Sequence, residues 1–231
     1  MIPDGATIQL GLGGMANAIG YGLKDKKHLG VHTEMYTESM AYLTKIGVID
    51  NSRKTFMPGV SVAGFVLGSK DLYEYCNNNE GTYFGPFSFV NNVTNIMKND
   101  NMISINNALE VDLYGQVCSE GIGFRHFSGT GGQVDYVRGA VMSNGGKSFI
   151  ALPSTYTDKS GNVHSKIVLN FSQGTPVTTL RSDVQYIVTE YGCVDLFGED
   201  LVTRAKKLIS IAHPQFRDKL MFEAKKHNLI Y

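Results

Sequence analysis

Apolar positions in the first fifty residues follow two periods, which predict alternating strands and helices. The run ATIQLGL at 6–12 is typical of a buried strand entering a glycine-rich turn. A helix is expected next, because apolar residues recur at helical spacing: Met15, Ala18, Ile19 and Leu23. A short strand around LGVHT at 29–33 precedes a second helix, expected from about Glu34 to Gly47. The stripe that predicts this helix consists of Tyr36, Met40, Leu43 and Ile46.

Later segments extend this alternation. MISINNAL (102–109) and VDLYGQVCS (111–119) are predicted to form paired strands. Buried strands are expected at KSFIALP (147–153), SKIVLNF (165–171) and VQYIVTEYG (184–192). Helical spacing returns after Asp200, and Pro214 is expected to open a last helix. The pattern predicts an α/β fold, an open, largely parallel sheet with flanking helices.

Composition narrows the function classes. The chain has 231 residues, 42% of them hydrophobic, enough for a substantial core. Lys plus Arg and Asp plus Glu both number 21, so global charge favours neither nucleic acid nor an anionic membrane as a partner. The three cysteines form no CxxC pair, which argues against a disulfide framework or a zinc site. With no signal peptide and no run of ~18 apolar residues, we expect a cytoplasmic protein.

The first candidate site is the glycine turn GLGGMA at 11–16. It satisfies G-x-G-x-x-G/A, and Glu34 lies about twenty residues further on, where a ribose-binding acid is expected in a dinucleotide fold. A tight turn that needs only glycine's backbone freedom explains the motif equally well. In either case, a glycine turn leading into a helix exposes backbone N–H groups that stabilise negative charge.

Two further segments also carry glycines or an acidic residue that can contact a ligand. GTGGQVDYVRGA at 129–140 contains three glycines in four positions, and Asp135 and Arg138 can pair with each other or bind a ligand. In VTEYG, Glu190 follows an apolar strand, so we expect it at the carboxyl edge of a sheet, where open α/β folds bind ligands. A turn and a solvated acid remain the alternatives. Together with the first glycine turn, these segments predict one crevice.

Other candidates carry weaker signals. Asn91 and Asn92 in FSFVNNVTN have amides that can donate to a substrate carboxyl, although helix capping is the commoner role. His32 has the chemistry of a general base but no Ser or Cys pattern beside it. The six histidines show no metal-binding spacing, so no metal site is predicted. GGKS at 145–148 lacks the upstream glycine that a P-loop requires.

Several segments in the same order closely resemble the C-terminal half of the acetyl-CoA hydrolase/transferase family, near its 4-hydroxybutyrate and butyryl-CoA:acetate CoA-transferases. They include IPDGATIQLGLGGMANAI, LGVHTEM, GTGGQVDYVRGA, KSFIALPST, VTEYG and RAKKLISIAHPQFRDKL. The likeness extends over nearly all 231 residues and is far more specific than the glycine motif alone. It favours a CoA-transferase-like domain over a dinucleotide-binding one.

The resemblance implies that Glu34 is a nucleophile. Ionised near neutral pH, this carboxylate would attack an acyl-CoA thioester and then carry CoA as a glutamyl thioester, in a ping-pong exchange between a short-chain acyl-CoA and acetate. Neither a metal nor a permanently bound cofactor is needed, since coenzyme A is substrate and covalent intermediate. By the same resemblance, Asn91 lies close to the reacting carboxyl.

The resemblance also implies CoA-contacting groups at Gly14, Met15, Gly131, Gly132 and Glu190. The backbone N–H groups of the glycine segments would stabilise an oxyanion, and Glu38 has no counterpart, so it is expected to be a dispensable helix-surface acid. Family members carry a further N-terminal half, which is absent here. We therefore expect residues 1–231 to be the C-terminal domain of the enzyme, present as a truncated form, a gene fragment or one subunit of a split enzyme. Its expected partner is the N-terminal half of the enzyme, and the complete enzyme is expected to form a homo-oligomer. A thioesterase of the same family and a non-catalytic CoA- or nucleotide-binding module are the alternatives.

Overall fold

The computed structural model of the chain describes all 231 residues and divides into two compact units. The first unit comprises residues 1–107 and 135–148, and the second comprises 108–134 and 149–231.

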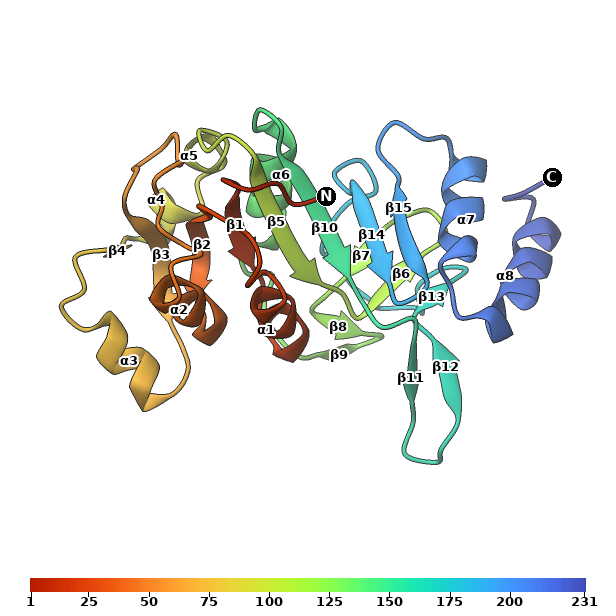
Figure 1. Cartoon of the computed structure of the whole chain (residues 1–231). Coiled ribbons are helices and arrows are strands. Elements are labelled where there is room, and N and C mark those ends of the chain that lie inside the picture. The colour runs from red at the N-terminus through yellow and green to blue at the C-terminus, as the bar shows by residue number, and fades with distance from the viewer. The chain divides into compact units, whose positions relative to one another are not determined.

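The first unit is built on parallel strands in the order β5-β1-β2-β3-β4 (Figure 1). Its strands are β1 (Thr7–Leu10), β2 (Gly30–Tyr36), β3 (Ser61–Val66), β4 (Thr82–Phe84) and β5 (Met102–Asn107). Its helices are α1 (Gly14–Tyr21), α2 (Glu38–Lys45), α3 (Lys70–Cys76), α4 (Phe87–Val90), α5 (Val93–Ile96) and α6 (Gln133–Met142), the first two residues of α6 belonging to the second unit. The α/β class with largely parallel strands and flanking helices is confirmed.

The predicted strand, glycine turn and helix at the start of the chain are confirmed by β1 and α1. All four residues of β1 are buried, as its apolar pattern requires. Gly13 has φ = +107°, a conformation that residues with a Cβ rarely adopt, which is why glycine occupies the position before α1. Helices α1 and α2 lie side by side against the strands (Figure 1).

The second helix begins four residues later than the sequence pattern predicts. Residues 30–36 form β2, and α2 begins at Glu38 because Thr37 is its N-cap: the Thr37 side chain accepts a hydrogen bond from the Met40 N–H. Glu34 is therefore on a strand and not on a helix. Two consequences follow: Glu34 and Glu38 are not one helical turn apart, and Glu34 shares a face of β2 with His32.

A compact apolar cluster packs α6 onto the first unit. Tyr136 and Ala140 of α6 meet Ile96 and Met102, and all four are fully buried. Gly139, on the same helix, allows this close approach, because a Cβ there would lie 2.6 Å from the Ile96 Cβ. The close packing fixes α6 and with it the position of Tyr136.

We expect Gly139→Ala to destabilise the chain by about 2 kcal/mol, because overpacking a buried contact outweighs the helix propensity that alanine adds. Urea unfolding of the variant measures this. Gly129→Ala is the control, since a Cβ at Gly129 meets no atom within 4 Å. In the double variant with Ile96→Ala, the losses should be less than additive. Simple additivity would contradict the packing explanation.

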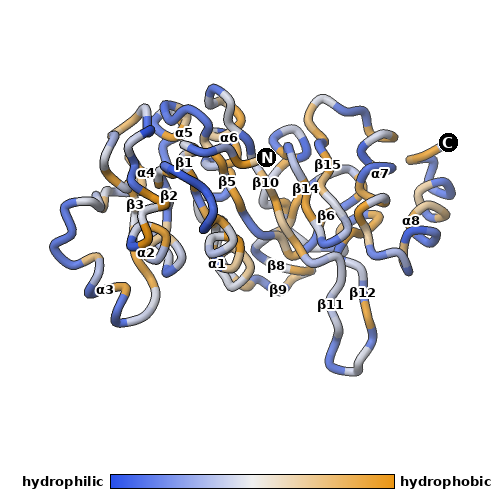
Figure 2. Tube along the Cα trace, in the orientation of Figure 1, coloured by the Kyte–Doolittle hydropathy of each residue, from blue (hydrophilic) through white to orange (hydrophobic).

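The second unit contains short strands and two C-terminal helices. Its elements are β6 (Glu110–Asp112), β7 (Val117–Cys118), β8 (Gly121–Ile122), β9 (Arg125–His126), β10 (Lys147–Ala151, beginning in the first unit), β11 (Thr155–Thr157), β12 (Val163–Ser165), β13 (Ile167–Val168), β14 (Tyr186–Thr189), β15 (Gly192–Asp195), α7 (Leu201–Ser210) and α8 (Pro214–Lys226). Strand β14 pairs in parallel with β10 and antiparallel with β15. Hydrophobic residues gather along β10, whereas the loop after α3 in the first unit is hydrophilic (Figure 2).

Two strand predictions need correction. The predicted pairing of 102–109 with 111–119 is wrong: β5 pairs with β1, and β6 pairs with β7 and β13. The stretch 165–171 is not one buried strand, because Ser165 ends β12, which pairs with β11, and only Ile167 and Val168 form β13. Segments this short have too few alternating positions to specify their partners.

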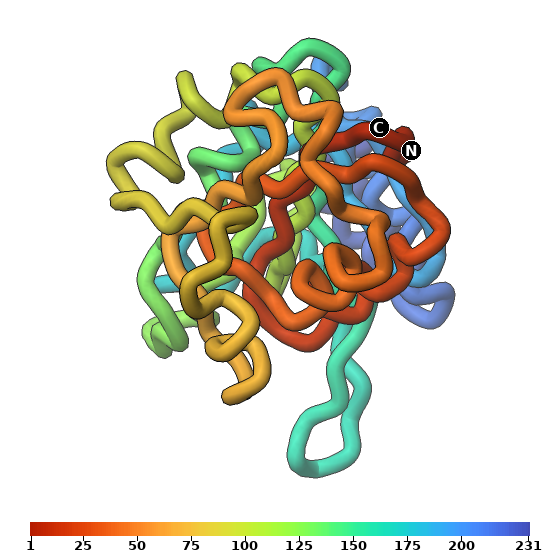
Figure 3. Tube along the Cα trace, turned by 60° about the vertical axis from the view of Figure 1, so that its left-hand side comes forward, coloured from red at the N-terminus to blue at the C-terminus, as the bar shows by residue number.

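The C-terminal predictions are confirmed. Asp200 caps α7 by accepting from the Thr203 N–H, and Pro214 occupies the first turn of α8, where its missing N–H costs nothing. The β11–β12 hairpin projects from the rest of the second unit in both views (Figures 1 and 3). None of the helices is long and apolar enough to cross a bilayer.

Candidate active site

Glu34 and Asn91 are brought together in the first unit. Glu34 lies near the end of β2, and Asn91 follows α4, 57 residues later in the chain. The Asn91 Nδ2 donates to Glu34 Oε2 at 2.9 Å, and both residues are half-buried. A carboxylate that keeps one oxygen hydrogen-bonded and is partly open to solvent suits a nucleophile. The predicted proximity of the two side chains is thus seen in the structure.

His32 lies two residues before Glu34 on β2 and is fully buried. Its Nε2 lies 2.8 Å from the Val90 carbonyl oxygen, and its Nδ1 lies 3.1 Å from Asn99 Nδ2. Burial lowers the pKa of His32 to about 4; the bond to Val90 opposes that shift, and the nearby Lys54 ammonium adds to it. His32 is therefore neutral at neutral pH and has no access to solvent, which does not suit a general base.

Lys54 itself is buried near the start of β2. Its Nζ donates to the carbonyl oxygens of Val31 and Val60, at 2.9 and 2.6 Å. Burial lowers the pKa of Lys54 to about 7. The bonds join β2 to the start of β3, so Lys54 supports the strand that carries Glu34.

Helix α6 supplies two further polar groups near Glu34. The Tyr136 hydroxyl, fully buried, lies 3.3 Å from the Val90 carbonyl oxygen and 3.4 Å from Asn91 Oδ1. Burial raises the pKa of Asp135, the negative charge of Glu34 raises it further, and Arg138 opposes the shift. The negative charge of Glu34 thus disfavours the ionised form of Asp135. The sequence had suggested Asp135 either as half of an ion pair with Arg138 or as a ligand-binding group.

The glycine turn before α1 lies beside a pocket of about 180 Å³ in the same unit. The pocket is lined by Gly11, Gly13, Gly14, Asn17, Met35, Thr37, Glu38 and Leu67. No side chain caps α1, and a Cβ at Gly14 would meet nothing within 4 Å. The first N–H groups of α1, including that of Met15, belong to an uncapped helix start with open space beside it, which suits an anionic group.

Glu38 is not simply an exposed acid of a helix surface. It is the first residue of α2, is half-buried, and its Oε1 accepts from the Ser69 N–H at 2.7 Å. Ser69 in turn is the N-cap of α3. The Glu38 carboxylate therefore holds the start of α3.

The other predicted site residues belong to the second unit. Gly131 is exposed with φ = +56°, and Gly132 is buried directly before α6. Glu190 follows the last residue of β14, as predicted, and its carboxylate accepts from the Ser154 N–H at 2.9 Å and the Ser154 hydroxyl at 2.6 Å. Burial acts to raise the pKa of Glu190, but these bonds outweigh it and the net shift is downward. That the two groups of residues form one crevice stays a prediction.

Tyr136, Asn99 and the role of His32 were not found from the sequence. Tyr136 lies in an apolar helical stretch, where a buried tyrosine is most simply a core residue, and Asn99 lies in a polar run without a motif. Only the positions of β2 and Asn91 show that these side chains converge.

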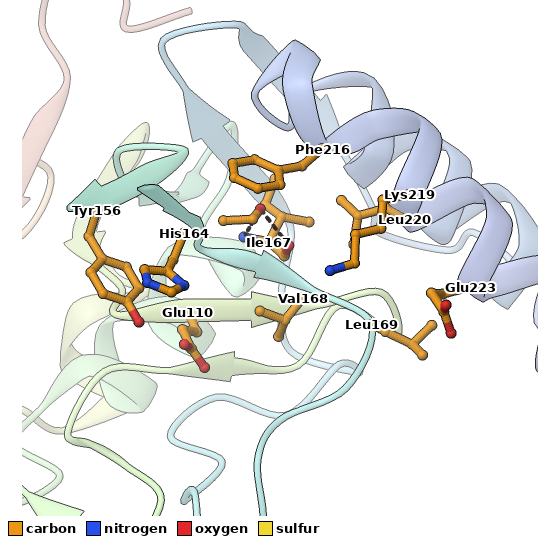
Figure 4. A pocket seen from close by; sticks show the side chains of 11 residues that line it. Glu110, Tyr156, His164, Ile167, Val168, Leu169, Phe216, Lys219, Leu220 and Glu223 are labelled. Atoms are coloured by element: carbon orange, nitrogen blue, oxygen red, sulfur yellow. Dashed lines mark hydrogen bonds between the residues drawn. The ribbon is translucent and has the colours of Figure 1, made fainter. Parts of the chain in front are cut away.

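The second unit has its own groove of about 340 Å³ (Figure 4). Phe216 and Leu220 of α8 line it together with Ile167 of β13, and Tyr156 stacks on His164 across the β11–β12 hairpin at a ring distance of 5.0 Å. None of the predicted site residues lines this groove. No group of His, Cys, Asp and Glu side chains has the geometry of a metal site, and the three cysteines are free.

The parallel strands, the glycine turn before α1 and the carboxylate near the end of β2 belong to an α/β domain like that of a solved CoA-transferase structure. The sequence model of the acetyl-CoA hydrolase/transferase C-terminal domain matches residues 68–224, and the chain belongs to this family. It is 51% identical to the 4-hydroxybutyrate coenzyme A transferase of Clostridium kluyveri, over 98% of the chain and 52% of that protein. It is 47% identical to the butyryl-CoA:acetate CoA-transferase of Anaerostipes caccae, over 97% of the chain and 51% of that protein.

Solved structures agree. RipA from Yersinia pestis superposes with a TM-score of 0.92 at 44% identity, covering 99% of the chain and 51% of RipA. The 4-hydroxybutyrate CoA-transferase from Porphyromonas gingivalis gives a TM-score of 0.83 at 41% identity, covering 98% of the chain and 52% of that protein. The chain spans about half the length of the curated relatives it matches.

Proposed function

We propose that this chain is the C-terminal half of a CoA-transferase that exchanges CoA between a short-chain acyl-CoA, butyryl-CoA or 4-hydroxybutyryl-CoA, and acetate. The observation that carries the proposal is the hydrogen bond from Asn91 Nδ2 to Glu34 Oε2, in a chain of this family. Relatives named as transferases of 4-hydroxybutyrate and butyrate support the substrate class.

The exchange proceeds through Glu34 in balanced steps. The Glu34 carboxylate attacks the carbonyl carbon of the acyl-CoA thioester, and the C–S bond breaks. The products are a mixed anhydride between the acyl group and Glu34, and CoA thiolate as the leaving group. The thiolate attacks the glutamyl carbonyl, releasing the first carboxylate and forming a glutamyl-CoA thioester. Acetate then attacks that thioester to give a second anhydride and CoA thiolate. Attack of the thiolate on the acetyl carbonyl yields acetyl-CoA and restores Glu34, with no net proton transfer.

Residues around Glu34 supply position and charge stabilisation. The Asn91 amide donates to a glutamyl oxygen, first of the carboxylate and then of the tetrahedral intermediates, where negative charge develops on oxygen. The α1 N–H groups at Gly14 and Met15 offer an anion-binding helix start in the same unit. Gly131, Gly132 and Glu190 are proposed to contact CoA. The N-terminal half, in cis or as a separate subunit, completes the cleft.

The test uses the chain joined to the N-terminal half of the Clostridium kluyveri relative. After incubation with butyryl-CoA, peptide mass spectrometry is expected to find CoA attached to Glu34, and added acetate should yield acetyl-CoA. An adduct on a different residue, or acetyl-CoA formed with no adduct, contradicts the mechanism. Release of free CoA without acetate, at the rate of transfer, indicates a thioesterase instead. Transfer at an ordinary enzymatic rate by residues 1–231 alone refutes the need for the N-terminal half.

Asn91→Ala is expected to slow formation of the Glu34 adduct roughly a hundredfold, because loss of one donor to a developing oxyanion costs on the order of 10² in rate. The rate of adduct formation is measured under single-turnover conditions by quenching the reaction at set times. Asn92→Ala is the control: Asn92 caps α5 through the Thr94 N–H and has no bond to Glu34. If Asn91→Ala and Asn92→Ala slow adduct formation by the same factor, local folding and not the amide of Asn91 is responsible.

A further inference from the structure

A short chain of hydrogen bonds connects the strand that carries Glu34 to the residue directly before Asn91. His32, on β2, bonds to the carbonyl oxygen of Val90 at 2.8 Å, and Asn91 bonds to Glu34 at 2.9 Å. His32 and Glu34 are two residues apart on one strand and therefore point to the same side. The segment Val90–Asn91 is thus held to β2 at two adjacent points.

The direction of each bond follows from Asn99. Its Nδ2 donates to the Ile96 carbonyl oxygen at 3.1 Å, which fixes the amide orientation because a carbonyl only accepts. The same Nδ2 lies 3.1 Å from His32 Nδ1, so Nδ1 must be the unprotonated nitrogen. Nε2 then carries the hydrogen and donates to Val90. The neutral state of the ring agrees with its complete burial.

The Val90 carbonyl has no other strong partner. It lies at the end of α4, a helix of four residues, and the last carbonyls of a helix have no partner within it. The Tyr136 hydroxyl reaches it only at 3.3 Å and also reaches Asn91 Oδ1 at 3.4 Å, so one proton is shared between two long contacts. The 2.8 Å hydrogen bond from His32 is therefore the one that holds the Val90 carbonyl group in place.

We propose that His32 is a positioning residue: its Nε2–H holds the Val90 carbonyl and thereby keeps the Asn91 amide within hydrogen-bond distance of Glu34. This inference rests on the proposed function, since positioning matters only if Glu34 reacts. His32 touches neither substrate nor the reacting atoms. It differs from the general-base role that the sequence suggested.

Two near-isosteric substitutions separate this role from packing. Glutamine places its Nε2 close to the histidine Nε2, so His32→Gln retains a donor to Val90. Asparagine places its amide near the histidine Nδ1, so His32→Asn retains a partner for Asn99 and loses the bond to Val90. His126→Asn, at an exposed position on β9, controls for replacing a histidine in general.

The first measurement is Glu34 adduct formation in the chain joined to the N-terminal half. We expect His32→Asn to slow it roughly tenfold, the value of one hydrogen bond, and His32→Gln to stay within about threefold of wild type. A merely structural role predicts that the two variants lose rate in proportion to their loss of unfolding free energy. Equal rates in His32→Asn and His32→Gln would overturn the proposal.

The second measurement does not depend on activity. In residues 1–231, the side-chain NH₂ signals of Asn91 are compared by NMR with and without the substitution Glu34→Ala, which removes the acceptor of the Asn91 hydrogen bond. We expect one amide proton of Asn91 to change its chemical shift on this substitution in wild type and in His32→Gln, and the response to be lost in His32→Asn. A response that survives in His32→Asn refutes the positioning role. If wild type forms no Glu34 adduct while the NMR pattern is as expected, the proposed function fails and the positioning stands.

Discussion

Glu34→Gln is expected to abolish the CoA adduct and to reduce transfer by a factor on the order of 10⁴ or more, as loss of a catalytic nucleophile typically does. An amide has the shape of the carboxylate, and its oxygen still accepts from Asn91, so the fold and the Asn91 contact should be unchanged. What is lost is the anionic oxygen that attacks the thioester in the proposed mechanism. Initial rates of acetyl-CoA formation and mass spectrometry of the Glu34 peptide measure the effect.

The matched control is Glu74→Gln, which removes an exposed acid from α3 of the same unit. Full transfer by the control and unchanged unfolding of both variants would assign the loss to the chemistry of Glu34. Residual activity in Glu34→Gln requires a check for deamidation, which restores glutamate and would appear as a mass increase of about one dalton in the peptide. Turnover by a variant that is confirmed as Gln would refute a covalent role for this residue.

Acidification below pH 6.5 is expected to cost the chain up to about 3 kcal/mol of unfolding free energy through His32 alone. The native pKa of His32 is about 4 and the ordinary value is 6.5. Between these values the unfolded chain binds a proton that the native chain does not, so stability falls as pH falls; above 6.5 both states are neutral and the effect vanishes. The size follows from about 1.4 kcal/mol per pKa unit.

Urea unfolding at pH 7, 5.5 and 4.5 measures this dependence in wild type and in His32→Gln, which cannot titrate. Other groups act in the same range, and Glu190, whose pKa is lowered, also loses stabilisation in acid. The informative quantity is therefore the difference between the two proteins, which should shrink toward low pH. If the unfolding free energies of wild type and His32→Gln differ by the same amount at all three pH values, His32 is not buried in its neutral form.

The sequence predicted the glycine turn, the C-terminal helices and the α/β class because long apolar periods and capping residues carry those signals. It misplaced the start of α2 because Tyr36 fits a helical stripe as well as a strand. The hydrogen bond that the Thr37 side chain accepts from the Met40 N–H shows that the helix begins after Thr37, so Tyr36 belongs to the strand. The G-x-G-x-x-A match itself reflects a real strand, turn and helix, a geometry that dinucleotide folds share.

The pairing of Glu34 with Asn91 was predicted only from the family resemblance, since 57 residues separate them and no periodicity links them. Tyr136 and Asn99 lay beyond prediction for a similar reason. Their importance comes from the tertiary placement of α6 and α5 around β2. Local patterns describe elements, whereas the convergence of side chains from four elements is a property of packing.

The bond between His32 and the Val90 carbonyl has a consequence for sequence variation. It is made to the backbone, so the side chains of α4 take no part in it. Exchange of Phe87, which is 53% exposed and contacts the Phe65 ring, therefore leaves the acceptor of this bond in place. The partner of the Glu34 carboxylate is thus held by a backbone group, whose identity does not depend on which side chains α4 carries.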